Sequence, residues 1–519
     1  MRSTPAARPA VLTTRAMPRR NTNKLSHLLA ADLRRQILSG ALPADHQLPP
    51  EVELTASLQV SRDTLREALR ILESQSLLEI RRGRGGGAVV RRPGLDAVGR
   101  YVALLLQLRR TTLAHLEEAR SVVEPPAAEQ FALHAAPEDT DRLVALHDAE
   151  REAESDPLSF VTAVAAFEQA VTELSRNRTL GVVAGVFRDI YSGHVFSVIG
   201  STDPTTAERI ARRVIVSHSA FLDAARRCDG ALAKKTWSDY LFTTSRLLVS
   251  RARSRQPFDI TPLWRARAAR AETGPSPRRG LAVATEIRAR IAEGRLRDGD
   301  RLPSLADLAI EFDISRPTLR EALRILEMEF LLDLRTGDRG GATIRTPSTQ
   351  VAAQLAGIVL EARETTLSDF TRAAWLIEPA IIELVASRIS ASSLKRLHQM
   401  EAELDDCIGD TDRFMRTWEE AAGVAFAATR NPALTVAAEI LRCVRVAVVP
   451  ALTADVTTLP WVTKSNRKAH VLFAELVSAL AAHDSDRARD LWTTILELAT
   501  PFAEEETGLG RRLVIDLVG

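Results

Sequence analysis

The stretch SRDTLREALRILE, Ser61 to Glu73, decides the fold of this chain. It occurs a second time as SRPTLREALRILE, Ser315 to Glu327, and twelve of the thirteen residues are identical. A near-perfect internal repeat of this length indicates that one structural unit is present twice. The surroundings of both copies therefore have to be interpreted together.

Each copy predicts a short amphipathic helix. Ser61 suits the N-cap position, because its hydroxyl can accept a hydrogen bond from a free backbone N–H of the first turn. One face is apolar and a second face carries arginines every four residues: Leu65, Ala68, Leu69 and Leu72 on the first, Arg62, Arg66 and Arg70 on the second. A basic helix with an apolar back fits the DNA major groove. A solvated surface helix is the alternative for the arginine row alone.

The flanking sequence favours the DNA-binding interpretation. A helix is expected over 25–39, a second short helix after the Leu-Pro-Pro-Glu turn at 48–51, and strands over 77–80 and 88–92. The strands enclose the glycine-rich run RRGRGGG at 81–87. Three helices followed by a hairpin predict a winged helix-turn-helix. A nucleotide-binding loop is excluded, because no GxxxxGK[ST] motif is present and no helix follows the glycines.

The next region contains only helical patterns. Proline, aspartate and asparagine mark its breaks, and the expected helices cover 95–109, 112–134, 138–153, 157–175, 178–199, 204–227 and 230–250. Pro125 and Pro126 should kink the second of these helices. Seven helices with short connections predict an antiparallel bundle.

The whole pattern restarts after residue 280. Pro347 matches Pro93 and Asn431 matches Asn177, each 254 residues further on. The predicted fold is mainly α, with two winged helix-turn-helix domains, each with a small β-wing, alternating with two all-α bundles. Its parts are a disordered basic tail (1–24), winged helix 1 (25–93), bundle 1 (94–250), an exposed linker (251–280), winged helix 2 (281–347), bundle 2 (348–505) and a C-terminal tail (506–519).

Composition narrows the class of protein. The net charge of +2 is nearly neutral, so any basic surface has to be local. Residues 61–92 hold eight arginines against four acids, whereas residues 315–346 hold six against five, so the first copy suits DNA better. The three cysteines, 228, 407 and 443, form no metal or disulfide pattern, and no apolar run is long enough for a membrane span. A cytoplasmic location is expected.

These motifs resemble a known family. Each half is similar to a GntR-family transcription regulator of the FadR subfamily, in which a winged helix precedes an all-helical ligand-binding domain of the FCD type. The resemblance covers residues 25–250 and 281–505. It rests on the LP(P/S) turn, the SRxTLREALRxLE helix and the glycine-rich wing, in that order. It implies a sequence-specific DNA-binding regulator that acts as a homodimer on near-palindromic operators.

The resemblance also implies the DNA-contacting residues. In the first half these are Ser61, Arg62, Thr64 and Arg66 on the helix, with Arg82 and Gly83 at the wing. Their counterparts in the second half are Ser315, Arg316, Thr318, Arg320, Thr336 and Gly337. The chain departs from the family after the Leu-Pro turn, where an arginine usually follows a glutamate. Val52 and Ala306 stand there instead, so operator specificity should differ from that of typical members.

Ligand-binding residues follow from the same resemblance. Many FCD domains hold a metal through an aspartate and three histidines, and those positions read Val164, Glu168, His218 and Tyr240 in the first half. In the second half they read Trp418, Ala422, Phe473 and Ile495, which cannot bind a metal in that way. We expect no metal in either half, although His218 leaves that alternative open in the first. Arg120 stands where the family often anchors a ligand carboxylate, or it pairs with Glu117 or Glu124 at helical spacing.

The sequence therefore predicts a transcription regulator, most simply a metabolite-responsive repressor, with two DNA-reading modules in one chain. Its partners would be double-stranded operator DNA and a small effector, a carboxylate or an acyl compound. The chain would act as a pseudo-dimer by itself or as a homodimer. The rival hypothesis is a ligand-independent architectural DNA-binding protein with degenerate pockets. An enzyme is not expected, because no catalytic constellation or cofactor motif is present.

Overall fold

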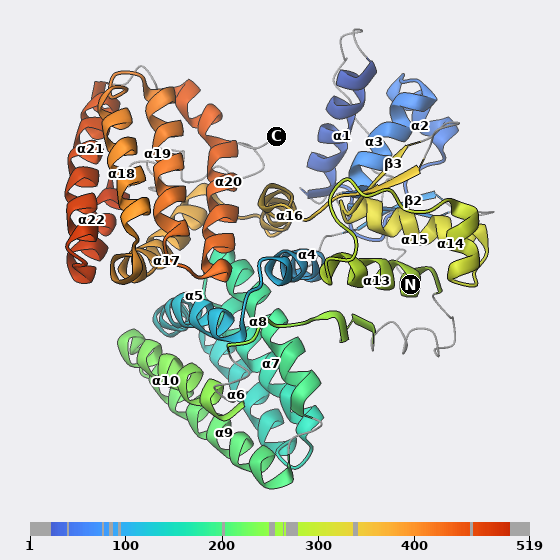
Figure 1. Cartoon of the computed structure of the whole chain (residues 1–519). Helices are drawn as coiled ribbons and strands as arrows, with labels where there is room; N and C mark the ends of the chain where they lie inside the picture. Colours follow the sequence, from blue (N-terminus) through green and yellow to red (C-terminus); the bar gives the residue numbers. More distant parts are fainter. Residues whose placement is uncertain are drawn as a thin grey trace, which may run out of the picture. The chain divides into compact units, whose positions relative to one another are not determined.

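A computed structural model shows how the chain folds, and it divides into two compact units (Figure 1). It describes residues 22–38, 41–74, 77–81, 87–91, 95–199, 203–248, 255–262, 264–265, 279–335, 341–456 and 460–498. The first unit comprises residues up to Gly94 together with Asp298–Arg345, and the second comprises Leu95–Arg297 together with the residues from Thr346. The predicted fold class, mainly α with two small wings, is confirmed.

The first unit begins with the predicted winged helix. Its elements are α1 (Thr22–Leu38), α2 (Glu51–Leu58), α3 (Arg62–Ser74), β1 (Leu78–Arg81) and β2 (Gly87–Val90). The two strands pair antiparallel, with Leu78 opposite Val90. The predicted apolar stripe of α3 is buried, with Leu65, Ala68, Leu69 and Leu72 each at most 3% exposed. Helix α1 starts three residues earlier than expected, and the rest of the predicted N-terminal tail lies outside the described residues.

The same unit holds the second winged-helix copy. It consists of α14 (Leu305–Glu311), α15 (Arg316–Met328), β3 (Leu332–Arg335) and β4 (Gly341–Ile344). The helix that precedes this copy, α13 (Arg279–Ala292), belongs to the second unit. The strands again pair antiparallel, with Leu332 opposite Ile344. The two copies thus repeat one local structure, as the duplicated sequence requires.

Helices α3 and α15 contact each other within the first unit. The guanidinium of Arg324 donates to the carboxylate of Glu73. The equivalent pair with the halves exchanged is Arg70 and Glu327, and the Arg70 charge acts on the Glu327 carboxyl. Burial raises the pKa of Glu327, and the two arginines oppose that rise. This exchange of equivalent partners is the signature of a two-fold relation between the copies.

The second unit contains both helical domains. The first helical domain consists of α4 (Leu95–Leu108), α5 (Leu113–His134), α6 (Pro137–Glu152), α7 (Pro157–Glu173), α8 (Arg178–Ile199), α9 (Pro204–Arg226) and α10 (Gly230–Leu248). The second consists of α16 (Thr349–Ala362), α17 (Leu367–Arg388), α18 (Ala391–Asp405), α19 (Thr411–Ala427), α20 (Pro432–Val456), α21 (Pro460–Ala481) and α22 (Ser485–Glu497). The seven predicted helices of the first half are confirmed within two residues at most ends. Helix α5 continues through Pro125 and Pro126.

Local sequence explains where these helices begin. Asp156 and Asp203 each cap a helix that has proline at its first position, and their carboxylates accept from the backbone N–H of Ser159 and Thr206. The core of the first helical domain lies between α5, α7, α9 and α10. Its largest side chains are fully buried: Phe131, Phe167, Phe221 and Trp237.

The two helical domains contact each other through equivalent elements. Helix α5 packs on α20 while α17 packs on α8, and α4 packs on its own counterpart α16. The side chain of Asn177 donates to the backbone carbonyl of Asp369 at 3.3 Å, and that of Asn431 donates to the carbonyl of His115 at 3.0 Å. Asn431 is 254 residues beyond Asn177, and Asp369 is 254 beyond His115. The interface is therefore isologous, like that of a symmetric dimer.

The structure corrects part of the prediction that residues 251–280 form an exposed linker. Residues 255–262 and 264–265 of this segment pack within the second unit, where Phe258, Ile260 and Trp264 are each at most 9% exposed, and residues 279–280 begin α13. Phe258 donates its backbone N–H to the carbonyl of Thr111 at 3.0 Å. Three apolar side chains in an arginine-rich run thus anchor this stretch. The prediction of an exposed linker is wrong for these three side chains, because average composition hides a few well-spaced apolar residues.

Candidate DNA-binding helices and ligand cavity

The N-terminal turn of each recognition helix presents arginines to solvent. Arg62 and Arg66 of α3 are exposed, and so are Arg316 and Arg320 of α15. The serine before each helix caps it: Ser61 accepts from the N–H of Thr64 at 3.1 Å, and Ser315 does so from Thr318 at 3.3 Å. The cap fixes the start of the helix and therefore the direction of the arginines that follow.

The threonine of each cap has a mainly positional role. The hydroxyls of Ser61 and Thr64 lie 2.8 Å apart, as do those of Ser315 and Thr318. Thr64 is only 2% exposed, so little of its surface is available to a phosphate. Thr318 is half-buried. The serines and arginines are the accessible part of the predicted set. The predicted wing residues, Arg82, Gly83, Thr336 and Gly337, lie outside the described residues.

The two recognition helices differ in how their second arginine is held. Arg66 donates through Nε to Glu51 at the start of α2, at 3.0 Å. In the second copy the position of Glu51 is taken by Leu305, and within the described residues Arg320 has no hydrogen-bonding partner. DNA binding by Arg66 would therefore require its release from Glu51, whereas DNA binding by Arg320 would need no such step.

Replacing Glu51 by glutamine should tighten DNA binding by the first winged helix. The pair is exposed on both sides, and such pairs contribute roughly 0.2–1 kcal/mol, so we expect Kd to fall by a factor of about 1.4 to 5. Fluorescence anisotropy with a labelled duplex measures the change. Glu53→Gln on the same helix is the control, since it removes the same charge from an exposed glutamate without releasing Arg66. Equal effects of the two changes would show that only overall charge matters.

A cavity of about 1220 Å³ opens in the first helical domain. Helices α5, α7, α8, α9 and α10 supply its walls. Apolar residues such as Phe160, Val161 and Leu241 form much of the lining, and Glu117, Arg120, Glu168, Tyr191 and Tyr240 form a polar group in it. A large, mainly apolar cavity with a few convergent polar groups is the usual form of a small-molecule site.

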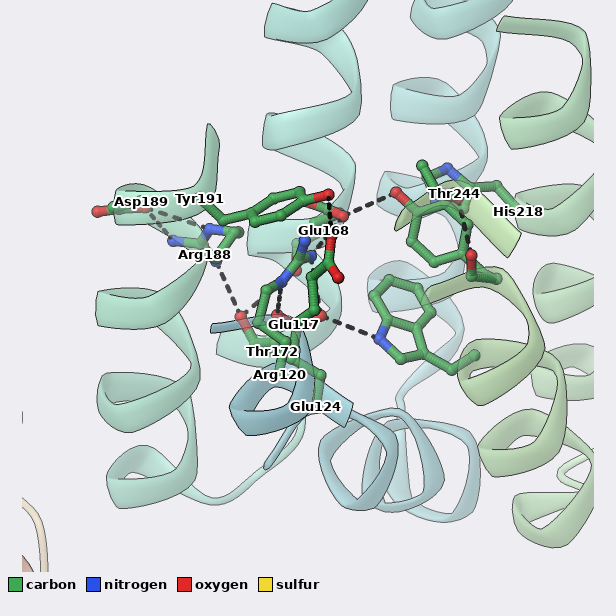
Figure 2. Close-up of polar contacts among 12 residues, drawn as sticks. Glu117, Arg120, Glu124, Glu168, Thr172, Arg188, Asp189, Tyr191, His218 and Thr244 are labelled. Carbon is green, nitrogen blue, oxygen red and sulfur yellow. Dashed lines mark hydrogen bonds and ion pairs between the residues drawn. The ribbon is translucent and has the colours of Figure 1, made fainter. Parts of the chain in front are cut away.

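Arg120 is the centre of the buried polar group (Figure 2). It donates through Nε to Glu124 Oε1 at 2.6 Å and through Nη2 to Glu124 Oε2 at 3.2 Å and Glu168 Oε1 at 2.8 Å. Its guanidinium also lies over the ring of Tyr191, 4.6 Å from the centroid. Arg120 is 4% exposed, Glu124 0% and Glu168 4%. The helical pairing with Glu124 that the sequence allowed is therefore present, together with a second carboxylate that is distant in sequence.

Two further donors complete this cluster. The Tyr240 hydroxyl donates to Glu168 Oε1 at 2.7 Å, and the Trp237 indole donates to Glu124 Oε2 at 3.2 Å. Burial raises the pKa of Glu124, against the opposing effect of Arg120. Burial would also raise the pKa of Glu168, but Arg120 and the Tyr240 hydroxyl outweigh it and lower that pKa. Two carboxyls thus share one guanidinium, and their pKa values are shifted in opposite directions.

His218 belongs to a separate buried cluster. Its Nδ1 lies 2.8 Å from Glu150 Oε1, and Nδ1 of His147 lies 2.9 Å from Glu150 Oε2. The His218 ring stacks on Phe167 with centroids 4.2 Å apart. Both His218 and Glu150 are 0% exposed. The predicted ligand residue is thus a core histidine whose Nδ1 is paired with a carboxylate.

This geometry does not fit the family's metal site. Val164 offers no ligand atom, and Glu168 already accepts bonds from Arg120 and Tyr240. Among the residues that the structure describes, no group of three or more His, Cys, Asp or Glu side chains is arranged to hold a metal ion. We derive no metal chemistry for this domain.

Acid should destabilise the first helical domain through Glu150. Burial would raise the pKa of Glu150, but His218 and His147 outweigh it and lower that pKa. A carboxyl with a depressed folded pKa contributes stability above its unfolded value of about 4.3 and loses it as pH falls through the folded value. Glu150→Gln should lower the melting temperature at pH 7 and flatten its decline below pH 5. Exposed Glu152→Gln, on the same helix, should leave the pH profile unchanged.

The second helical domain rebuilds the same ion cluster from different positions. Arg445 of α20 donates to Glu378 Oε1 at 2.9 Å and to Glu419 Oε1 at 2.6 Å. Trp492 donates to Glu378 Oε2 at 3.0 Å, as Trp237 does to Glu124. Arg445 occupies the position of Tyr191, while Ala374 occupies that of Arg120. The charge balance is kept although the arginine has moved to another helix.

Aromatic side chains fill the centre of the second domain. Trp418 stands at the position of Val164, and its ring centroid lies 5.5 Å from that of Phe473 and 5.9 Å from that of Trp492. Phe473 and Ile495 are at most 5% exposed. Aromatic and aliphatic side chains therefore occupy the centre of the second domain. The two domains therefore differ where the first has its cavity.

Sequence reasoning missed several residues of the cavity. Glu117 and Tyr191 line it and were not assigned to it. The buried contacts of Trp237 with Glu124 and of Glu150 with His218 were not predicted either. One available signal was the comparison of the halves, in which an arginine is lost at 374 and gained at 445. A glutamate is likewise lost at 422 and gained at 419. Such paired exchanges indicate a buried charge balance that has to be kept.

Fold and surface together define a helix-turn-helix transcription regulator. The family described as "Bacterial regulatory proteins, gntR family" matches residues 25–87 and again 280–341, and the "FCD domain" family matches 115–242 and again 370–498. The chain belongs to the GntR family of DNA-binding transcription regulators, and each of its two winged helices is followed by an FCD domain. It is a regulator and not an enzyme.

Known relatives match one half of the chain at a time. An uncharacterised helix-turn-helix regulator of Mycobacterium tuberculosis, Rv0494, is 28% identical over 233 residues, covering 45% of this chain and 93% of that protein. The transcriptional repressor NanR of Escherichia coli K12 is 26% identical over 231 residues, covering 43% and 83%. The solved Streptococcus agalactiae GntR structure covers 43% of this chain and 99% of its own, at 21% identity and a TM-score of 0.35. Among the helices that the structure places, none is long and apolar enough to cross a membrane.

Proposed function

We propose that this chain is a metabolite-responsive repressor that reads a two-half-site operator with both of its own winged helices. The observation that carries this is the pseudo-two-fold pairing of the halves. Equivalent contacts join the recognition helices through Arg324 and Glu73, and join the helical domains through Asn177 and Asn431. A homodimer of single modules would use such contacts between two chains. Here one chain supplies both sides, and the covalent connection raises their effective concentration.

The effector would act through the first helical domain. That domain retains a cavity, whereas Trp418 and Phe473 fill the corresponding region of the second. A ligand can change DNA affinity only by binding the DNA-competent and the released conformations differently. We propose repression rather than activation because NanR, a relative whose direction of regulation is known, is a repressor. Such a regulator would work in the cytoplasm, where the operator DNA is.

The operator should be an imperfect palindrome. The recognition helices share twelve of thirteen residues, but Arg66 is paired with Glu51 and Arg320 has no equivalent carboxylate. Two recognition helices that are similar but not identical should bind two half-sites that are similar but not identical. The half-sites should lie about one helical turn apart. A ligand-independent architectural protein would bind DNA regardless of metabolite, and the cavity in the first domain argues against it.

Selection of genomic fragments by the purified chain, followed by the mass of its complex with the enriched duplex, tests the proposal. We expect a motif with two related half-sites and a complex of one chain per duplex. A symmetric motif bound by two chains would show that the first halves of two molecules pair instead. Enrichment of no motif would contradict sequence-specific regulation altogether.

A further inference from the structure

We propose that the effector of the first helical domain is an organic cation, an amine with an apolar body, whose ammonium group is received by Glu117 and Glu168. The inference rests on the proposed effector-responsive function and names the chemical class of the ligand. It replaces the carboxylate or acyl compound that the position of Arg120 suggested. The reason is the balance of charge around the cavity.

The buried polar group holds more carboxylates than cations. Arg120 is the only basic side chain among the described residues of that group, and its Nε and Nη2 donors are directed to Glu124 and Glu168. Glu117 faces the same cavity and is not bonded to Arg120. A ligand carboxylate placed here would face two glutamates, Glu117 and Glu168, beside one guanidinium that is already paired, and the two carboxylates would repel it. The same carboxylates would attract an ammonium group.

Glu117 and Glu168, the two carboxylates proposed to bind the ammonium group, each have an oxygen that can accept a hydrogen bond from it. Glu168 accepts from both Arg120 and Tyr240 through Oε1, and among the described residues Oε2 accepts no hydrogen bond. Glu168 lines the cavity, where an ammonium group, which has three N–H donors, would bind this second oxygen. Glu117 accepts one long bond, from the Tyr191 hydroxyl at 3.5 Å.

The rest of the cavity suits the same ligand. Seven acidic and three arginine side chains line it, so its field attracts cations throughout. The Tyr191 ring stands beside Glu117 and already lies against one cation, the Arg120 guanidinium (Figure 2). Phe160, Val161 and Val164 offer apolar walls for a hydrocarbon body. Together these features select an amphipathic amine over an inorganic ion or an acid.

Burial supplies a pH signature that is independent of DNA. Burial raises the pKa of Glu117, against the lowering effects of Arg120 and Tyr191. An ammonium ligand favours the ionised carboxylate, so its affinity should fall as the medium is acidified. A carboxylate ligand would show the reverse trend, because protonating Glu117 removes a repulsion. The direction of the trend therefore separates the two ligand classes.

Thermal denaturation of the full-length protein with matched probe pairs tests the proposal. The probes are hexylamine and hexanoate, and phenethylamine and 3-phenylpropionate, each at about 10 mM and pH 7. We expect at least one amine to raise the melting temperature by a few degrees, as a ligand near ten times its Kd does, while its carboxylate counterpart does not. Glu117→Gln should abolish the shift. Glu138→Gln, an exposed change on α6, should keep it.

Two outcomes would overturn the inference. One is stabilisation by a carboxylate whose amine counterpart has no effect, which would return Arg120 to the role of anion anchor. The other is no shift with any amine in a protein that melts normally. Both results concern ligand binding alone, and the selection of DNA fragments is made without ligand. Failure of the amine inference is thus distinguishable from failure of the proposed regulator.

Discussion

Arg62→Ala and Arg316→Ala are each expected to weaken binding to the selected operator about 5- to 150-fold, and the double variant should lose specific binding. An arginine at a base edge contributes roughly 1–3 kcal/mol of discrimination, which is the source of this range. Both side chains are exposed at the first turn of a capped helix. Electrophoretic mobility shift at fixed salt measures the loss, because phosphate contacts depend steeply on salt.

The pattern of loss is as informative as its size. Each single variant should erase sequence preference in one half-site and keep it in the other. Arg142→Ala, an exposed arginine of the first helical domain, is the control and should bind like the unaltered protein. If Arg316→Ala binds normally, the second winged helix does not read DNA, and the operator is read by the first halves of two chains.

Arg120→Met should destabilise the first helical domain by about 3–5 kcal/mol. Removing one partner of a buried ion cluster leaves the remaining charges uncompensated, and here two glutamates are at most 4% exposed. Differential scanning calorimetry would show the corresponding transition at a lower temperature. Arg151→Met, which removes an arginine with a 65% exposed side chain, is the matched control and should change little.

The second half of the chain suggests how to rescue that variant. There the arginine stands at 445 and its partner glutamate at 419, which correspond to 191 and 165 of the first half. Moving the charges accordingly, with Arg120→Ala, Tyr191→Arg, Ala165→Glu and Glu168→Ala, should recover much of the lost stability. The rescued protein should no longer bind the amine probes, since Glu168 and Tyr191 are gone. Failure to recover any stability would show that the two clusters are not equivalent.

Much of the fold followed from local sequence. The stripe at Leu65, Ala68, Leu69 and Leu72 predicted a buried face because helical periodicity depends only on neighbours in the chain. Aspartate followed by proline marked the helix starts for the same reason. The near-identical repeat then allowed the same predictions for the second half. These are short-range effects, and sequence records them directly.

The candidate site was only partly predictable. Arg120 and Glu124 are one helical turn apart, and their pairing was among the interpretations considered. Glu168 is 48 residues from Arg120, and its contact depends on how α5 and α7 pack. Tertiary packing also decides which charges face the cavity. A carboxylate ligand was expected because the position of Arg120 was interpreted without the glutamates that pack around it. The burial of Trp264 was missed because one aromatic residue has little effect on the average composition of a thirty-residue segment.

The reciprocal contacts of Asn177 and Asn431 have a consequence for the dose response of regulation. A regulator assembled from two separate chains below its dimer dissociation constant occupies its operator in proportion to the square of its concentration. A chain that contains both halves occupies it in direct proportion. In the proposed single-chain form, halving expression would halve the occupied fraction at low levels rather than quarter it. A defective copy of the gene would also leave the intact product unaffected, because no mixed dimer forms.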